Sequence, residues 1–323
     1  MKVASFFCGA GGMDLGFKQA GYEVVYANEI DTKIAPTYNH NHNLIVDCRD
    51  IQKVMPEDIP EVDGFIGGPP CQSWSTAGAQ RGINDPRGQL FLEYIRLIKA
   101  KQPKFFVCEN VPGILFQKNL PAFNYFLEGF HDAGYVTTYK KLNAKDFNSA
   151  QDRERVIIVG FRKDLNIIPD LNLTKNSSIT FEDAIYDLKD TAVPGNNNKH
   201  KEDLSILNHE YFEGGFSSMF MSRNRVRSWN EKSFTVQATG RQCQLHPQAP
   251  KMEKIGTDKF RFIPGEEDKY RRLTIRECAR LQGFPDDFEF LYDNLDYGYK
   301  MVGNAVPVPM AKAIADRVSQ LLN

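Results

Sequence analysis

The sequence predicts an α/β protein in which a doubly wound sheet is joined to a second, smaller and irregular domain. Short apolar runs alternate with helical patterns in the first half of the chain, which is typical of strands covered by helices on both faces. Beyond about residue 170 this alternation is lost, and polar runs such as PGNNNKHKED separate short candidate strands. We therefore expect a first domain over residues 1–170, completed by a C-terminal helix over 298–323, and a second domain over 171–297.

The predicted strands and helices follow one another regularly. The strand candidates are VASFF (3–7), VVYAN (24–28), GFIGG (64–68), FFVCENV (105–111), VTTYKKL (136–142) and RVIIVGF (155–161). Helical spacing of apolar residues marks 13–20, 90–100 and 122–133 between them. Near the end of the chain, four apolar side chains fall on one face of a helix over 308–322: Met310, Ile314, Val318 and Leu321. We expect this helix to pack on the first domain.

The composition predicts a globular cytoplasmic protein. With 41% hydrophobic and 25% charged residues, the 323-residue chain can bury a full core. Its first apolar run is broken by glycines, so neither a secretory signal nor a membrane-spanning helix is predicted there. The six cysteines form no C-x-x-C pair, which favours reduced thiols over disulfides or a zinc cluster. We expect neither a metal nor a membrane partner.

The net charge of −1 conceals a basic segment. Residues 220–282 contain fourteen Lys and Arg against seven Asp and Glu, a surplus of +7, so the rest of the chain carries −8. A positive segment of this kind is what a polyanion-binding face needs. A solvated surface without a partner would have the same charge, so other observations must decide between the two.

Three successive strand ends carry residues suited to a small ligand. Glycines lie where the first strand turns into a helix: Gly9, Gly11 and Gly12. Backbone can approach a ligand closely there, and Glu29 at the end of the second strand could hold a pair of ribose hydroxyls. Asp50 and Ile51 could meet an adenine amine and ring face. The spacing differs from G-x-G-x-x-G, which argues against a nicotinamide dinucleotide.

The segment Gly67-Gly68-Pro69-Pro70-Cys71-Gln72 predicts a nucleophile. Two prolines restrict the backbone and present Cys71 at the end of a strand, where α/β folds have their active sites. A thiol is a weak nucleophile until it ionises, so we expect a helix N-terminus or a cation nearby. The other five cysteines are more simply explained as small buried side chains.

Two further segments supply polar groups for the same edge of the sheet. Glu109 ends a buried strand and could reach the pocket of Cys71 as a proton donor. In Gln151-Asp152-Arg153-Glu154-Arg155, the period-two spacing predicts Arg153 and Arg155 on one side of a strand, suited to an anion or a base carbonyl. An edge strand with salt bridges would explain the same pattern.

In this order the motifs resemble those of the cytosine-5 DNA methyltransferases along nearly the whole chain. The matching motifs are F-x-G-x-G-G, Asn-Glu, Pro-Pro-Cys-Gln, Glu-Asn-Val, Gln-x-Arg-x-Arg, RECARLQGFP (276–285) and GNAVP (303–307). The resemblance implies a Rossmann-like methyltransferase sheet with a target-recognition domain, S-adenosylmethionine as cofactor and double-stranded DNA as partner. We expect a monomer, since a palindromic site can be served by a monomer acting twice. Cys8 departs from the family pattern, which has Ala or Ser there.

The resemblance also implies roles for individual residues. Those expected around S-adenosylmethionine are Phe7, Gly9, Gly11, Gly12, Glu29, Asp50, Ile51 and Asn304. Those expected to form the catalytic pocket are Pro70, Cys71, Glu109, Arg153 and Arg155. The Cys71 thiolate would add to carbon 6 of a flipped-out cytosine while Glu109 holds N3 and the amine. Carbon 5 would then accept the methyl group before Cys71 is eliminated.

The basic segment predicts sequence readout. Arginine pairs with guanine O6 and N7, so we expect Arg225, Arg227 and Arg241 to make base contacts, although phosphate clamping would explain any one of them. Residues 218–250, together with DPRG at 85–88, resemble the GGCC-specific enzymes of the family. The resemblance implies GGCC as the target, within a restriction–modification system.

Three other functions would explain parts of the same sequence. A tRNA cytosine-5 methyltransferase would use the same pocket, but the arginine-rich second domain favours duplex DNA. A zinc deaminase would need H-x-E with P-C-x-x-C, which this sequence lacks. A DNA-binding module without catalysis would not need both Cys71 and Glu109.

Overall fold

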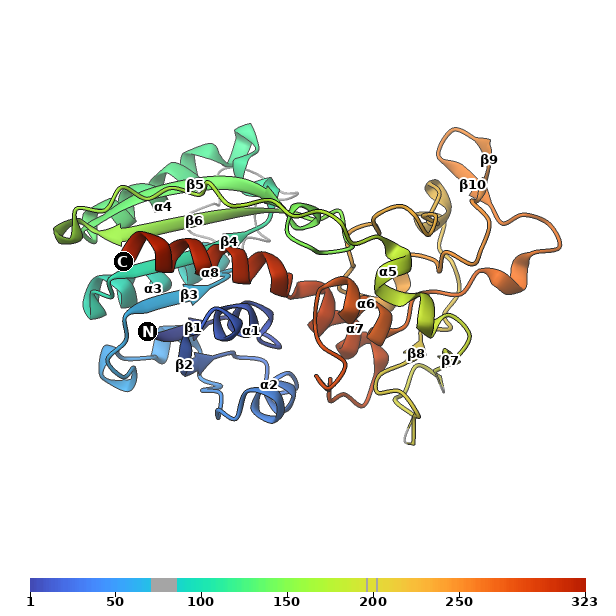
Figure 1. The fold of residues 1–323 in the computed structure, drawn as a ribbon, viewed down its shortest axis with the longest axis horizontal. Helices are drawn as coiled ribbons and strands as arrows, with labels where there is room; N and C mark the ends of the chain where they lie inside the picture. Colours follow the sequence, from blue (N-terminus) through green and yellow to red (C-terminus); the bar gives the residue numbers. More distant parts are fainter. Residues whose placement is uncertain (71–85, 196, 202) are drawn as a thin grey trace. The chain divides into compact units, whose positions relative to one another are not determined.

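The computed structural model describes residues 1–70, 86–195, 197–201 and 203–323. Within these residues the chain forms two compact units (Figure 1). Unit 1 comprises Met1–Asn143, Glu154–Lys175 and Met310–Asn323. Unit 2 comprises Ala144–Arg153 and Asn176–Pro309. A functional division into a catalytic and a target-recognition domain stays a prediction.

Unit 1 is built on a six-stranded mixed sheet with the order β2-β1-β3-β4-β6-β5. The strands are β1 (Lys2–Phe6), β2 (Glu23–Asn28), β3 (Gly64–Gly67), β4 (Phe105–Asn110), β5 (Tyr135–Asn143) and β6 (Glu154–Arg162). β1 to β4 run parallel, whereas β6 is antiparallel to both β4 and β5. The predicted α/β class is confirmed. Because β1, β3 and β4 are covered on both faces, their sequences are continuous apolar runs rather than alternating ones.

Helices pack on both faces of this sheet. They are α1 (Gly12–Gln19), α2 (Ala35–His42), α3 (Pro86–Lys101), α4 (Leu120–Asp132) and the part of α8 (Val308–Leu322) that belongs to unit 1. On one face, Phe91 of α3 stacks on Phe126 of α4 at 4.0 Å between ring centroids, and Phe106 of β4 stacks on Phe130. Neighbouring β4 residues point to opposite faces of the sheet. On the other face, the ring of Phe105 contacts the ring of Tyr22, which follows α1. The Tyr22 hydroxyl donates to the carbonyl of Ala315 in α8.

Unit 2 has little regular structure. Its elements are α5 (Phe181–Ile185), α6 (Ile275–Leu281), α7 (Leu295–Asn304), the parallel pair β7 (Val193–Pro194) and β8 (Glu210–Tyr211), and the hairpin β9 (Glu253–Gly256) and β10 (Lys259–Arg261). A small apolar cluster fills its interior, with Phe220, Val226, Leu245 and Tyr270 as members. Side-chain hydrogen bonds hold backbone outside these elements; Arg272, for example, donates to the carbonyls of Phe212, Gly214 and Gly215.

The C-terminal helix expected over 298–323 is two helices. α7 ends at Asn304, α8 begins at Val308, and Ala305 between them is extended with ψ 147°. Pro307 explains the break, because a proline disfavours helical backbone in the residue before it. Three members of the expected apolar face of α8, Met310, Ile314 and Val318, are almost fully buried, whereas Leu321 in the last turn is only half-buried.

Candidate active site

The loop between β1 and α1 turns through left-handed backbone conformations. Phe7, Gly9 and Gly11 have φ values of 54°, 55° and 85°. A Cβ at Gly11 would lie 2.1 Å from the ring nitrogen Nε2 of His42, so only glycine fits there. A Cβ at Gly9 would meet no atom within 4 Å. The loop therefore has one side packed against the protein and one side open to a ligand.

The carboxylate of Glu29 lies against this loop. Its Oε2 accepts a hydrogen bond from the Gly9 N–H at 3.0 Å, and its Oε1 accepts one from the Asp31 N–H at 2.9 Å. Glu29 directly follows β2, so the carboxyl ends of two neighbouring parallel strands meet here. The structure brings Glu29 and the glycine loop together as the sequence predicts.

The other predicted cofactor contacts lie on separate elements. Asp50 caps the short 3-10 helix Ile51–Lys53 by accepting from the Gln52 N–H at 3.0 Å. Ile51 is 3% exposed and packs in the core of unit 1. Gly12 is the first residue of α1, and Asn304 is the last residue of α7, with an exposed side chain. Contacts from these residues to a cofactor stay predictions.

The carboxyl ends of β3 and β4 bring together part of the predicted catalytic pocket. Arg155 Nε lies 2.7 Å from Glu109 Oε1, and each side chain is 12% exposed. The Asn110 side chain donates to the Pro69 carbonyl at 3.0 Å. A Cβ at Gly68 would lie 3.1 Å from Glu109 Oε2. The backbone that leads toward the proposed nucleophile therefore lies directly beside the Glu109 carboxylate.

Pro70 is half-buried and ends this described segment, and Cys71 lies outside the described residues. The role of Cys71 thus stays a prediction that rests on the sequence. The described cysteines, which are Cys8, Cys48, Cys108, Cys243 and Cys278, are free thiols. Burial raises the pKa of Cys8 and of Cys278 well above the ordinary value, which keeps these two thiols protonated and unreactive.

Arg153 and Arg155 bind different partners, and only Arg155 lies within the strand. β6 begins at Glu154, and Arg153 therefore precedes the strand. The Arg153 side chain is 1% exposed and donates to three carbonyls of unit 2, those of Val236, Gly303 and Ala305, at 2.8 to 3.1 Å. Two of these carbonyls flank Asn304. Any contribution of Arg153 to the cytosine pocket stays a prediction.

The three predicted base-reading arginines differ in how far their guanidinium groups are bound within the protein. Arg225 is 6% exposed, and it donates to the carbonyls of Phe220 and Met219 at 2.8 and 2.9 Å. Burial lowers the pKa of Arg225 to about 10. Arg227 pairs with Glu231 at 3.2 Å.

Arg241 is exposed, and its guanidinium makes no hydrogen bond or ion pair with any described residue. Among the three, Arg241 is the one whose donors are all available to DNA. Base contacts by all three residues stay predictions.

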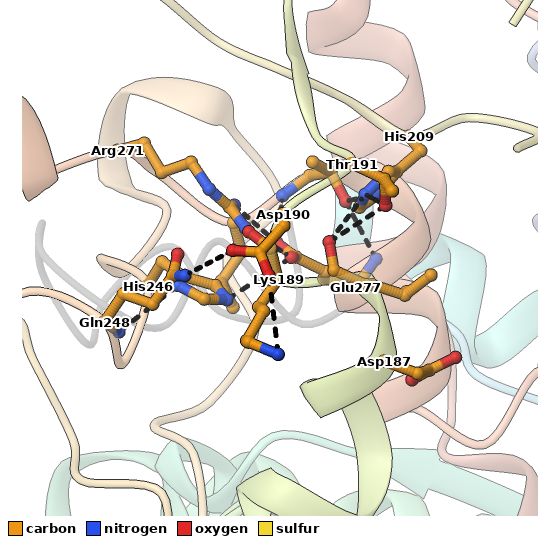
Figure 2. Close-up of polar contacts among 12 residues, drawn as sticks. Asp187, Lys189, Asp190, Thr191, His209, His246, Gln248, Arg271 and Glu277 are labelled. Atoms are coloured by element: carbon orange, nitrogen blue, oxygen red, sulfur yellow. Dashed lines mark hydrogen bonds and ion pairs between the residues drawn. The ribbon is translucent and has the colours of Figure 1, made fainter. Parts of the chain in front are cut away.

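His246 belongs to a buried polar network in unit 2 (Figure 2). Arg271 donates to both oxygens of Glu277 at 2.7 and 2.8 Å, and His246 Nε2 lies 3.5 Å from Oε1. The side chains of His246 and Glu277 are fully buried. Burial alone would raise the pKa of Glu277, but the charge and hydrogen bonds of Arg271 bring it below the ordinary value.

Sequence reasoning missed this network, although one signal was available. Thr274-Ile275-Arg276-Glu277 has the capping-box pattern. In the structure, Thr274 Oγ1 accepts from the Glu277 N–H at 3.0 Å, and Glu277 Oε2 accepts from the Thr274 N–H at 2.8 Å. His246 had no comparable signal, because its partner is distant in the chain. Sequence reasoning likewise missed Asp14, Tyr38 and His42 beneath the glycine loop.

Among the residues that the structure describes, no group of three or more His, Cys, Asp or Glu side chains could hold a metal ion. No described helix is both long enough and apolar enough to cross a membrane.

The chain is similar to type II methyltransferases over its whole length. M.FnuDI of Fusobacterium nucleatum is 54% identical, with 100% of this chain and 95% of that protein covered. M.NgoPII of Neisseria gonorrhoeae is 53% identical, with 100% and 96% covered. M.MthTI of Methanothermobacter thermautotrophicus is 51% identical, with 99% and 97% covered.

Solved structures and the family profile agree with these relatives. A structure assigned to a DNA modification methyltransferase of an E. coli prophage has a TM-score of 0.76 at 25% identity and covers 100% of this chain and 99% of that one. A DNMT2 variant of Spodoptera frugiperda, at 19% identity, shares the fold with a TM-score of 0.70 and 99% of each chain covered. The profile of the C-5 cytosine-specific DNA methylases matches residues 1–320. The chain therefore belongs to the C-5 cytosine-specific DNA methylase family and is a DNA (cytosine-5) methyltransferase.

Proposed function

We propose that the enzyme transfers a methyl group from S-adenosylmethionine to carbon 5 of a cytosine flipped out of duplex DNA, with Cys71 as the nucleophile. The observation that carries this proposal is the pair of Glu109 and Arg155 beside the backbone of Gly68 and Pro69. A carboxylate with one oxygen fixed by a guanidinium, next to the segment that enters Pro-Pro-Cys, suits a polar pyrimidine edge.

The residues around the glycine loop fit S-adenosylmethionine. Glu29 and Asp50 offer carboxylate oxygens to hydroxyls and an amine, and the open side of Gly9 allows backbone contact. The N-terminus of α1, which begins at Gly12, favours the carboxylate of an amino-acid moiety. We propose that Phe7, Gly11, Ile51 and Asn304 complete this set. When bound, S-adenosylmethionine supplies an electrophilic methyl group.

In the proposed mechanism the protein makes carbon 5 nucleophilic. The Cys71 thiolate forms a bond to carbon 6, and Glu109 holds N3 and the exocyclic amine, so that electron density moves to carbon 5. Arg155 fixes the Glu109 carboxylate through Oε1, which leaves Oε2 for the base. Once carbon 5 carries the methyl group, a base takes its proton, the released electron pair re-forms the double bond between carbons 5 and 6, and Cys71 leaves carbon 6 as a thiolate. Base flipping costs a few kcal/mol, which pocket contacts must offset.

We further propose GGCC as the target sequence, in a cytoplasmic restriction–modification system served by a monomer. This proposal rests on residues 218–250 and on DPRG at 85–88, which we interpret as similar to the GGCC-specific HaeIII methyltransferase. The relatives named above are type II methyltransferases by name, which supports the restriction–modification context. Arg241 is the strongest candidate for a guanine contact, because its guanidinium is exposed and uncommitted among the described residues.

A trapping experiment tests the mechanism. A duplex with 5-fluorocytosine at the target blocks the last step, because no base can remove fluorine as a proton would be removed. Wild-type enzyme with S-adenosylmethionine should give a denaturation-resistant conjugate, with the DNA attached to the peptide that contains Cys71 in mass spectrometry. Cys71→Ala should give none while retaining DNA binding. A conjugate on another residue, or turnover by Cys71→Ala, would refute this assignment of the nucleophile.

A protection experiment tests the target sequence. Plasmid methylated by the enzyme should resist a GGCC-cutting nuclease and stay sensitive to nucleases that cut unrelated sites. Cleavage at GGCC, with methyl groups incorporated elsewhere, would overturn the target while leaving the activity intact. Methylation of tRNA in place of the duplex would overturn the choice of DNA.

A further inference from the structure

Three side chains lie beneath the glycine loop, on the side away from the open face of Gly9. Asp14 of α1 and Tyr38 of α2 are fully buried, and His42 at the end of α2 is 5% exposed. Their side chains are assigned no part in the chemistry above. Their contacts link β1, α1 and α2 to the backbone of the loop.

The contacts form a chain that ends on the loop. Asp14 accepts from Ser5 Oγ at 2.9 Å and from the Tyr38 hydroxyl at 2.5 Å. The Tyr38 ring stacks on the His42 ring with 4.2 Å between centroids and 19° between planes. His42 Nε2 lies 3.2 Å from the Ala10 carbonyl oxygen. Each link involves a group that is at least nine-tenths buried.

The protonation of His42 sets the direction of the last contact. Burial, with the charge of Lys18, lowers the pKa of His42 to about 4, so the ring is neutral at neutral pH. The Ala10 carbonyl can only accept, and Nε2 must therefore carry the proton and donate it. The Lys18 ammonium in turn donates to the backbone carbonyl of His42 at 2.9 Å, which ties the end of α2 to α1.

The loop needs such support because its backbone is in a costly conformation. Phe7 has φ 54°, which L-residues with a side chain rarely adopt, and Gly11 lies directly on the His42 ring. Without a fixed surface below it, the loop would relax to other conformations and lose the arrangement that meets a ligand. Binding of the ligand would then have to supply the free energy needed to order the loop.

We propose that Asp14, Tyr38 and His42 are positioning residues that hold the loop 7–12 in the conformation that binds the cofactor. This inference rests on the proposed use of S-adenosylmethionine at the same loop. It assigns the three residues to the affinity for the cofactor, not to the chemical step on the base.

Two variants remove single links of the chain. Tyr38→Phe removes the hydroxyl bound to Asp14, and His42→Phe keeps a flat ring but loses the donor to Ala10. His42→Gln is the conservative variant, because its amide nitrogen can reach the position of Nε2. Tyr135→Phe is the matched control. Tyr135 is fully buried in the same unit, and its hydroxyl donates to the Pro103 carbonyl at 2.7 Å rather than to a group that supports the loop.

The measurements are KM for S-adenosylmethionine and kcat at saturating DNA, Kd for S-adenosylhomocysteine by calorimetry, and the melting temperature without ligand. We expect Tyr38→Phe and His42→Phe to raise KM and Kd about tenfold with kcat within about twofold. His42→Gln should stay within about threefold of wild type. Tyr135→Phe should lower the melting temperature comparably while leaving KM unchanged.

Four outcomes are decisive. If Tyr135→Phe raises KM as much as Tyr38→Phe does, the effect is general destabilisation and the proposal fails. If kcat falls while KM is unchanged, the residues act on chemistry and the proposal also fails. Unchanged KM and Kd in folded variants refute it directly. If wild type itself binds no S-adenosylhomocysteine, the proposed cofactor is wrong, and this result is separate from the other three.

Discussion

The Glu109 carboxylate has one oxygen engaged by Arg155 and the other facing Gly68. Glu109→Gln keeps the shape of the side chain but replaces one oxygen by an amide donor. We expect kcat to fall by about 10² to 10⁴ with DNA affinity little changed, because the group acts on the base during reaction. Glu154→Gln is the control, since Glu154 pairs with Lys141 at the exposed surface. Equal losses in both variants would contradict a special role for Glu109.

Gly68 offers a test that leaves every polar group in place. In Gly68→Ala the new Cβ would lie 3.1 Å from Glu109 Oε2, a contact tight enough to displace the carboxylate by a few tenths of an ångström. We expect kcat to fall about tenfold, because catalysis depends on such positioning. Gly113→Ala is matched to it, since its nearest neighbour is Phe116 at 3.9 Å and nothing has to move. Single-turnover rates should separate the two variants, and equal rates would argue against the geometry.

Arg225 and Arg241 should respond differently to truncation. Arg241→Ala should reduce discrimination between the target and a duplex with one altered base by about 1 to 3 kcal/mol, with the melting temperature unchanged. Arg225→Ala should lower the melting temperature, because its guanidinium is bound to buried carbonyls. Methylation rates on matched and altered duplexes check both expectations. Retained discrimination in Arg241→Ala would remove it from the readout.

At the scale of elements, α6 depends on its buried carboxylate. Glu277 caps the helix, binds Arg271 and faces His246, so Glu277→Gln leaves a guanidinium without its charge partner. We expect unit 2 to lose about 2 to 4 kcal/mol of unfolding free energy. Urea denaturation followed by Trp229 fluorescence measures this, because Trp229 contacts His246 at 5.2 Å between ring centroids. Trp74→Phe in all variants removes the second tryptophan signal.

The control for this prediction is another Arg–Glu pair of unit 2. Glu253 and Arg261 in the hairpin β9–β10 lie 2.6 Å apart, but their side chains are 45% and 53% exposed. Glu253→Gln should cost less than about 1 kcal/mol, because water replaces the lost partner. Similar losses for Glu253→Gln and Glu277→Gln would mean that burial does not set the strength of the Glu277 network.

Elements with strong local patterns could be predicted from the sequence, and those fixed by distant contacts could not. The expected α3 and α4 and the strands of the sheet are found, because apolar runs and helical spacing reflect burial directly. α2 was missed, since APTYNHNH is polar and lacks a helical spacing of apolar residues. The break between α7 and α8 could have been inferred from Pro307. The different partners of Arg153 and Arg155 could not be predicted, because period-two spacing does not define where β6 begins.

The same contrast holds for the candidate site. Glu29 and Glu109 were found because each follows an apolar strand, and strand ends are where α/β folds bind ligands. Asp14, Tyr38, His42 and His246 were not, since their partners lie far away in the chain. Glu277 was missed although its partners Thr274 and Arg271 lie within six residues of it. Arg225 resembles a base reader in sequence, and only its hydrogen bonds to Met219 and Phe220 reveal its internal use.

For the whole molecule, buried neutral histidines predict sensitivity to acid in both units. Burial lowers the pKa of His42 in unit 1 and of His246 in unit 2 to about 4, against an ordinary value of 6.5. Between these values the unfolded chain binds protons that the folded chain does not, so unfolding becomes easier as the pH falls from 6.5 to about 4. Each histidine should account for about 3 kcal/mol over this range.

Unfolding free energies measured by urea between pH 7 and pH 4.5 check this expectation. His42→Gln and His246→Gln cannot take up the proton, so each should flatten the pH dependence of its own unit. His131→Gln is the control, since the His131 side chain is 69% exposed. An unchanged slope in both buried variants would contradict the assignment.

Unit 1 is assembled from three stretches of chain, and its last stretch, Met310–Asn323, is synthesised after all of unit 2. While the chain is still on the ribosome, unit 1 therefore lacks α8, and the apolar surface that α8 covers is exposed to solvent. Translation must pass residue 310 before this surface can be covered. A chain whose synthesis stops shortly before that point would retain almost every motif named above. It would nevertheless expose apolar surface to chaperones and proteases.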